Sequence, residues 1–281
     1  MTPVGIQPLP SRANPSLRRG PWRLEFSDGS LMKARRLETP ERAAAVEYLA
    51  GLCTHLPMAS VLARRGCLLL ESWIPGPTFD TILLGLDRAE AMGTLLGRLS
   101  RAGRGDRLAD PGRQRLLSAL EKLEKALTEL TQLQVLHADV ASRLLERALA
   151  NAPEHAEAGL VHLDVQPRNV VHRPDGPWLV DNELLEVGPL DLDLARTWLL
   201  WPMGAAEQAR FLNGYETYRS VASFRLHELF WAIYVTACSL AYRLRSGLPQ
   251  EGLLSALNRL VSGDLPRVWT SPGGMGMRSR Q

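Results

Sequence analysis

The residues whose types and spacing suggest chemistry lie between His162 and Glu183. Asp164 and Asn169 complete the pattern H-x-D-x-x-x-x-N, and Asp181 follows at the end of a later apolar run. A carboxylate can orient an attacking hydroxyl and accept its proton, and Mg²⁺ prefers carboxylate and amide oxygens as ligands. We therefore predict that Asp164 is the catalytic residue of a phosphoryl transfer, and that Asn169 and Asp181 are its magnesium ligands.

A predicted β-hairpin must bring these residues together. Two short runs, 170–172 and 178–180, flank the sequence R-P-D-G-P, in which Asp-Gly favours a tight turn. Because a hairpin reverses the chain direction, it would place Asp181 beside the loop that carries Asp164 and Asn169.

Lys33 is a second candidate, because lysine is rare in this chain. Of 33 basic residues only Lys33, Lys122 and Lys125 are lysine. Since arginine supplies most positive charges in this chain, a lysine indicates a position that requires its compact point charge. Lys33 lies in the second strand of a predicted hairpin, residues 22–26 and 31–35, around S-D-G-S. A helix is predicted to follow over residues 41–52, with Thr39 as its cap and Pro40 in its first turn.

The remaining pattern predicts an α+β fold with a small β-rich N-lobe and a larger, mostly helical C-lobe. A second hairpin is predicted over 59–63 and 67–72, and helices over 88–101, 111–133, 138–150 and from 193 to about 261. The apolar run 229–242 is too short to span a bilayer, which takes about 20 residues, so we expect a core helix. The predicted division is an N-terminal lobe 1–73, a linker 74–78, a C-terminal lobe 79–270 and a disordered tail 271–281.

Composition excludes several classes of protein. A net charge of +3 over 281 residues gives no footprint of a nucleic-acid binder. Three scattered cysteines argue against a disulfide framework and a zinc site, and favour reduced thiols in a cytoplasmic protein. Residues 1–10 show no secretion signal, and we expect no membrane partner. The oligomeric state stays open.

Three segments in order resemble the aminoglycoside phosphotransferase and choline kinase family, which has the protein-kinase-like fold. That family reads H-G-D-x-x-x-x-N, then I-D-W-E, then G-D-P-x-x-D-L-A. This chain has His162 to Asn169, then V-D-N-E at 180–183, then G-P-L-D-L-D-L-A at 188–195. The resemblance implies a bilobal kinase fold and transfer of the γ-phosphoryl group of ATP, with Mg²⁺, to a small-molecule hydroxyl. It also implies that Asp193 supports the catalytic loop.

The same resemblance assigns nucleotide contacts in the N-lobe. Lys33 would neutralise the nucleotide phosphates and be held by a helix glutamate, Glu41 by spacing or alternatively Glu47. The run 68–76, with Glu71 and Trp73, resembles the hinge strand whose backbone reads the adenine edge. A phosphate-covering loop would lie near residues 11–19.

Two departures from the family pattern keep an alternative open. Leu163 stands where the family has glycine, and Arg168 where a small residue is common. A nucleotide-binding or scaffolding pseudokinase is therefore the alternative to an enzyme. A protein Ser/Thr kinase is disfavoured, because no Phe-Gly follows Asp181 and no Ala-Pro-Glu segment ends an activation loop.

The acceptor class stays open among antibiotics, sugars and amino-alcohols. Acids lining its pocket would suggest a cationic acceptor; the candidates are Glu183, Glu186, Asp191 and Glu207.

Other polar and aromatic residues are interpreted as structural. His162 is expected to be a packed loop residue rather than a base, and Trp198 and Trp201 to be core. His137-Ala138-Asp139 repeats the H-x-D look but has Leu144 in place of the asparagine, so we assign it to a helix start.

Overall fold

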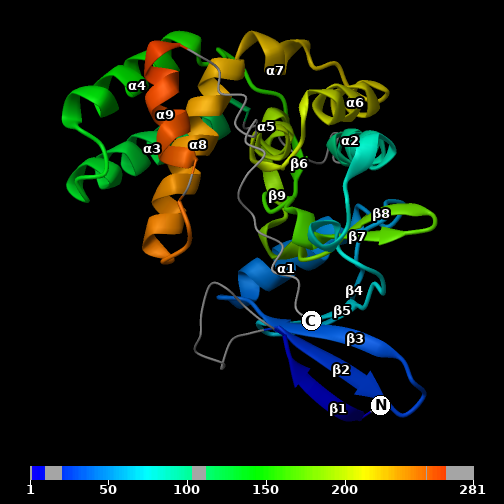
Figure 1. The fold of residues 1–281 in the computed structure, drawn as a ribbon. Helices are drawn as coiled ribbons and strands as arrows, with labels where there is room; N and C mark the ends of the chain where they lie inside the picture. Colours follow the sequence, from blue (N-terminus) through cyan, green and yellow to red (C-terminus); the bar gives the residue numbers. More distant parts are fainter. Residues whose placement is uncertain (1, 10–20, 103–111, 251, 264–281) are drawn as a thin grey trace, which may run out of the picture.

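The computed structural model describes residues 2–9, 21–102, 112–250 and 252–263. Within these residues an N-terminal antiparallel sheet lies on one side of a larger, mainly helical part (Figure 1). This arrangement confirms the α+β architecture predicted from the sequence. The predicted phosphate-covering loop near residues 11–19 and the predicted tail 271–281 lie outside the described residues.

Among the described residues the N-terminal sheet has five strands, which are β1 (Pro3–Pro8), β2 (Trp22–Phe26), β3 (Leu31–Arg36), β4 (Val61–Arg65) and β5 (Leu68–Ser72). Their order in space is β1-β2-β3-β5-β4, and every pair is antiparallel. Strands β2 to β5 are the two predicted hairpins. Strand β1 was not predicted, because its sequence P-V-G-I-Q-P is rich in residues that weaken strands. As an edge strand with one neighbour it tolerates proline.

Helix α1 (Pro40–Gly51) packs against the sheet, on the side that faces the helical part (Figure 1). The Thr39 hydroxyl accepts a hydrogen bond from the Arg42 amide at 3.1 Å, which confirms the predicted cap. The inner face of the helix buries Ala43, Val46 and Leu49. Helix α1 therefore meets the sheet with apolar side chains.

Helices α2 (Gly85–Ala102) and α6 (Ala205–Glu216) cross with their backbones in close contact. A Cβ atom on Gly93 would lie 1.8 Å from the Phe211 carbonyl oxygen. A Cβ atom on Gly214 would lie 2.1 Å from the Glu90 carbonyl oxygen. Only glycine fits these two positions, so the crossing fixes how the two helices pack.

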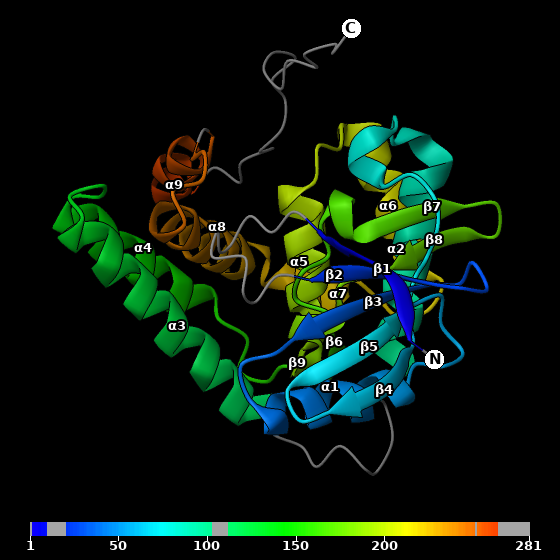
Figure 2. The same cartoon turned by 90° about the horizontal axis from the view of Figure 1, so that it is seen from below.

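A second helical group is formed by α3 (Gly112–Gln132), α4 (Ala138–Asn151), α8 (Glu228–Arg245) and α9 (Leu253–Ser262) (Figures 1 and 2). Helix α8 is the predicted apolar core helix, and it buries Phe230, Trp231 and Ile233. Within the described ranges, none of the helices combines the length and the apolar character needed to cross a membrane.

The region from residue 193 to about 261 is mainly helical, as predicted. It consists of α5 (Leu190–Leu200), α6, α7 (Ala222–Leu226), α8 and α9. Pro202 and Gly204 lie between α5 and α6, and both residue types interrupt helices.

Two small antiparallel pairs carry the candidate site. Strand β6 (Ala158–Val161) pairs with β9 (Glu186–Pro189), and β7 (Val170–Arg173) pairs with β8 (Gly176–Leu179) as predicted. The short turns η2 (Pro167–Asn169) and η3 (Asn182–Leu184) adjoin β7 and β8. An isolated bridge between Met58 and Leu179 connects the chain before β4 to β8. The ends of β6 and β8 thus lie between the sheet and the helices.

Candidate active site

The loop between β6 and β7 carries the H-x-D motif, and Asp193 fixes its backbone. Leu163 has a φ of 62°, a left-handed conformation that glycine adopts readily and that costs leucine roughly 1–2 kcal/mol. The Asp193 carboxylate, on α5, accepts hydrogen bonds from the His162 amide and, at 2.8 Å, from the Leu163 amide. The departure from glycine is therefore accommodated, and Asp193 has the supporting position that the resemblance implies.

Asp164 is held in one orientation by its neighbours. Its Oδ2 atom accepts a hydrogen bond from Asn169 Nδ2 at 2.7 Å, and its Oδ1 atom one from Gln166 Nε2 at 2.5 Å. The side chain keeps 13% of its surface exposed, and an Arg168 guanidinium nitrogen lies 3.9 Å from Oδ2. Asp164 is thus an oriented carboxylate with an open side.

Asp181 lies next to this loop, as the predicted hairpin requires. The amide of the preceding Val180 donates to the Asn169 carbonyl at 3.0 Å. The next residue, Asn182, is fully buried and donates to the Ala59 carbonyl at 2.8 Å, which ties the segment to the chain before β4. Asp181 itself has a φ of 72°, which aspartate tolerates better than most residues. The metal candidates Asn169 and Asp181 are brought together.

Two cations from β3 reach Asp181. Lys33 Nζ lies 3.2 Å from Asp181 Oδ1, and Arg35 contacts the same oxygen. Burial alone would raise the pKa of Asp181, but Arg35 and Lys33 outweigh burial and hold this pKa well below its ordinary value. The carboxylate is therefore charged at neutral pH, as a carboxylate that binds Mg²⁺ must be.

The donor set fits Mg²⁺. Because Asn169 uses its amide nitrogen on Asp164, its amide oxygen is directed elsewhere and can act as a ligand. In the part of the chain that the structure describes, no group of three or more His, Cys, Asp or Glu side chains could hold a metal. An ion bound by Asn169 and Asp181 would complete its shell with phosphate oxygens and water, the usual arrangement for Mg²⁺.

The structure does not bring Glu41 to Lys33. Glu41 is exposed near Thr39, and the alternative Glu47 pairs with Arg64 at 2.6 Å. Glu41 does not reach Lys33 because the side of α1 that faces the sheet carries apolar residues.

Glu71 and Trp73 lie on β5 and directly after it. The Glu71 side chain is fully buried and accepts a hydrogen bond from Arg35 Nε at 2.8 Å. Trp73 is half-buried, with the Arg23 guanidinium 5.8 Å from its ring centre. Sequence reasoning missed Arg35. The alternation of side chains along a strand could have identified it. Residues two apart on a strand share a face, and Arg35 is two residues after Lys33.

Two of the four acids considered for an acceptor pocket pair with arginines. Glu183 lies 2.8 Å from Arg35, and burial raises its pKa. Asp191 is buried against Arg219 at 2.6 Å. Glu186 on β9 and Glu207 in the first turn of α6, both half-buried, are the remaining candidates.

The residues interpreted as structural are buried or lie at a helix start. His162 is fully buried, and its Nδ1 atom faces the Asp164 amide at 3.4 Å. Trp201 is buried and donates to the Val165 carbonyl at 2.9 Å, so this core residue also supports the loop that carries Asp164. Asp139 is in the first turn of α4 and pairs with Arg143 at 3.1 Å, as expected for a helix start.

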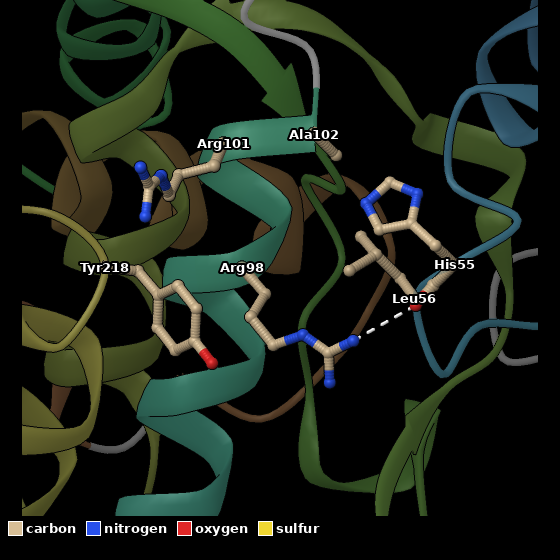
Figure 3. A pocket seen from close by; sticks show the side chains of 6 residues that line it. All are labelled: His55, Leu56, Arg98, Arg101, Ala102 and Tyr218. Carbon is tan, nitrogen blue, oxygen red and sulfur yellow. Dashed lines mark hydrogen bonds between the residues drawn. The ribbon is translucent and has the colours of Figure 1, made fainter.

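A cavity of about 180 Å³ lies elsewhere, between the loop after α1 and the end of α2 (Figure 3). Arg98, which lines it, donates to the His55 carbonyl at 3.0 Å. None of the predicted site residues lines this cavity. Its volume is below the roughly 300–1,000 Å³ of typical ligand pockets. It is therefore not the site of the chemistry.

Comparison with known proteins agrees with the prediction of a phosphotransferase. Residues 22–224 match the model of the phosphotransferase enzyme family (APH). Among curated protein sequences none matches.

Several solved structures share the fold. The macrolide 2'-phosphotransferase MphH from Brachybacterium faecium is 17% identical, with 93% of each chain covered and a TM-score of 0.64. The choline kinase LicA from Streptococcus pneumoniae is 13% identical, with 93% of this chain and 94% of that chain covered and a TM-score of 0.66. The amicoumacin kinase hAmiN, in complex with AMP-PNP, Ca²⁺ and its ligand, is 14% identical, with 93% and 88% covered and a TM-score of 0.62. The bilobal kinase-like fold is confirmed, and the chain belongs to the phosphotransferase enzyme family.

Proposed function

We propose that the protein transfers the γ-phosphoryl group of ATP to a hydroxyl group of a small molecule, with Mg²⁺. One observation carries the proposal: Asp164, Asn169, Asp181 and Lys33 converge where the sheet meets the helical part. These are the groups that phosphoryl transfer requires, and 148 positions of sequence separate Lys33 from Asp181.

Each residue has a role that follows from its contacts. Asp164, oriented by Asn169 and Gln166, would position the acceptor hydroxyl and accept its proton as the hydroxyl oxygen bonds to the γ-phosphorus and the bond to the β-phosphate oxygen breaks. Asn169 and Asp181 would hold Mg²⁺, which neutralises charge on the phosphates. Lys33 would neutralise the α- and β-phosphates. The protein contributes mainly positioning and electrostatics.

The nucleotide would bind between the two lobes. We propose an N-terminal lobe of residues 1–73 and a C-terminal lobe of residues 79–270, joined by 74–78. The Glu71 backbone is paired with both β3 and β4, so backbone groups from Trp73 onward, where β5 has ended and the linker begins, would contact the adenine edge. The three cysteines are free, which suits the cytoplasm as the site of the reaction.

The acceptor is proposed as an antibiotic, a sugar or an amino-alcohol. The solved structures named above include a macrolide 2'-phosphotransferase and a choline kinase, which supports this range. Glu186 and Glu207 remain of the four acids, so the described residues offer less negative charge for a cationic acceptor than the sequence suggested.

The test is ADP release with ATP and Mg²⁺ against aminoglycosides, macrolides, sugars and amino-alcohols, together with a thermal-shift titration of ATP and Mg²⁺. Acceptor-dependent ADP release is the expected result. A thermal shift without ADP release for any acceptor would favour the pseudokinase alternative. Absence of both would contradict nucleotide use.

A further inference from the structure

A buried arginine lies two residues after Lys33 on the same face of β3. Arg35 keeps 3% of its surface exposed, whereas the Lys33 side chain keeps 14%. A buried charge is costly unless it is fully paired. The partners of Arg35 therefore show what its position requires.

All three guanidinium nitrogens of Arg35 contact carboxylates, and each contacts a different one. Nε donates to Glu71 at 2.8 Å, one terminal nitrogen donates to Glu183 at 2.8 Å, and the other contacts Asp181. Glu71 is fully buried in β5, the strand paired with β3. Arg35 thus connects the interior of the sheet to both acidic residues of the D-N-E segment.

The D-N-E segment, residues 181–183, also contacts helix α1, but through a basic side chain. Arg42 donates to the Glu183 carbonyl oxygen at 2.7 and 3.2 Å. The acids of α1 point elsewhere, since Glu41 is exposed and Glu47 pairs with Arg64. The carboxylate that anchors a β3 cation comes from strand β5 and not from the helix.

We propose that Arg35, anchored by Glu71, is a positioning residue that holds Asp181 in place for metal binding. The strand-lysine and helix-glutamate pair expected from the resemblance is replaced by Arg35 and Glu71. Lys33, which is less buried than Arg35 and lies 3.2 Å from Asp181, is then left to contact the nucleotide phosphates. This inference rests on the proposed function, because it assigns Asp181 to the metal.

The experiment is a titration of Mg²⁺ at fixed ATP concentration, followed by nucleotide binding rather than turnover. ATP affinity is also measured in EDTA, without metal. In Glu71→Gln the concentration of Mg²⁺ for half-maximal binding should rise roughly 10- to 100-fold, the usual effect of removing a group that orients a metal ligand. ATP affinity in EDTA should be unchanged. Glu47→Gln removes a surface ion pair with Arg64 and is the matched control, with the wild-type Mg²⁺ dependence expected.

A double variant separates positioning from folding. Removing one partner of a buried ion pair destabilises strongly, whereas replacing both by apolar residues is often neutral. Arg35→Met combined with Glu71→Leu should therefore fold and still need roughly 10- to 100-fold more Mg²⁺. A wild-type Mg²⁺ dependence in this folded double variant, with ATP bound normally by the wild type, would overturn this inference alone. A wild-type protein that binds no ATP at any Mg²⁺ concentration would overturn the proposed function as well.

Discussion

Lys33 Nζ lies 3.2 Å from Asp181 Oδ1, although the two residues are 148 positions apart. The contact joins the N-terminal sheet to the end of β8, beside the loop that carries Asp164. It connects the rarest basic residue type of the chain to one of the two proposed magnesium ligands. The proposed reaction requires a cation and a metal ligand at this junction.

Lys33→Met should weaken ATP binding roughly 10- to 100-fold, since a hydrogen bond to a charged group contributes about 1.5–3 kcal/mol. Isothermal titration with ATP measures the effect. Lys125→Met is the control, because Lys125 is another of the three lysines and is exposed on α3. Equal ATP affinity in both variants would contradict the role of Lys33.

Asp181→Asn should lower the free energy of unfolding by about 2 kcal/mol at pH 7, because Arg35 and Lys33 lose a charged partner. The folded-state pKa of Asp181 is depressed, so its contribution is present above the unfolded pKa, about 3.9, and is lost as pH falls through the folded pKa. Urea unfolding of both proteins from pH 7 to pH 3 measures this. The difference between them should be constant above about pH 5 and shrink below about pH 4. A difference that grows as pH falls would show that the sign is wrong.

Asp193→Ala should destabilise the fold by about 2–5 kcal/mol, because the amides of His162 and Leu163 lose their acceptor while Leu163 is in a left-handed conformation. Denaturant unfolding measures the loss. Asp139→Ala removes an exposed i,i+4 ion pair and should change stability by less than about 1 kcal/mol. Similar losses in the two variants would mean that Asp193 does not hold the loop.

Gly93→Ala should destabilise by about 3 kcal/mol or more, because its new Cβ would lie 1.8 Å from the Phe211 carbonyl oxygen. Gly51→Ala, at the end of α1 with no atom within 4 Å of the added carbon, should be neutral or stabilising by up to about 1 kcal/mol. Thermal unfolding distinguishes the two. A stable Gly93→Ala protein would contradict the close crossing of α2 and α6.

The arrangement of the loop that carries Asp164 could be predicted from the sequence because its geometry is local. Asp164 and Asn169 are five residues apart, and a single hairpin brings Asp181 back beside them. The partners of the β3 cations could not be predicted, because they depend on which strand pairs with β3. Glu71 reaches Arg35 only through the β3–β5 register.

The prediction that a helix glutamate pairs with Lys33 was wrong for a related reason. The sequence places Glu41 and Glu47 on a helix, but the rotation of α1 about its axis depends on packing against the sheet. Ala43 and Val46 occupy the inner face, which leaves Glu41 exposed. Family spacing alone does not contain that information.

The most direct test of the central claim is Asp164→Asn, compared with Asp139→Asn in the second H-x-D motif. Acceptor-dependent ADP release and ATP binding are measured on both proteins, with the acceptor found in the panel. We predict that Asp164→Asn loses at least about 100-fold in release while its ATP affinity stays within about threefold of wild type, since general-base catalysis contributes about 10²–10⁴. Asp139→Asn should match wild type in both. Undiminished ADP release by Asp164→Asn would contradict the account.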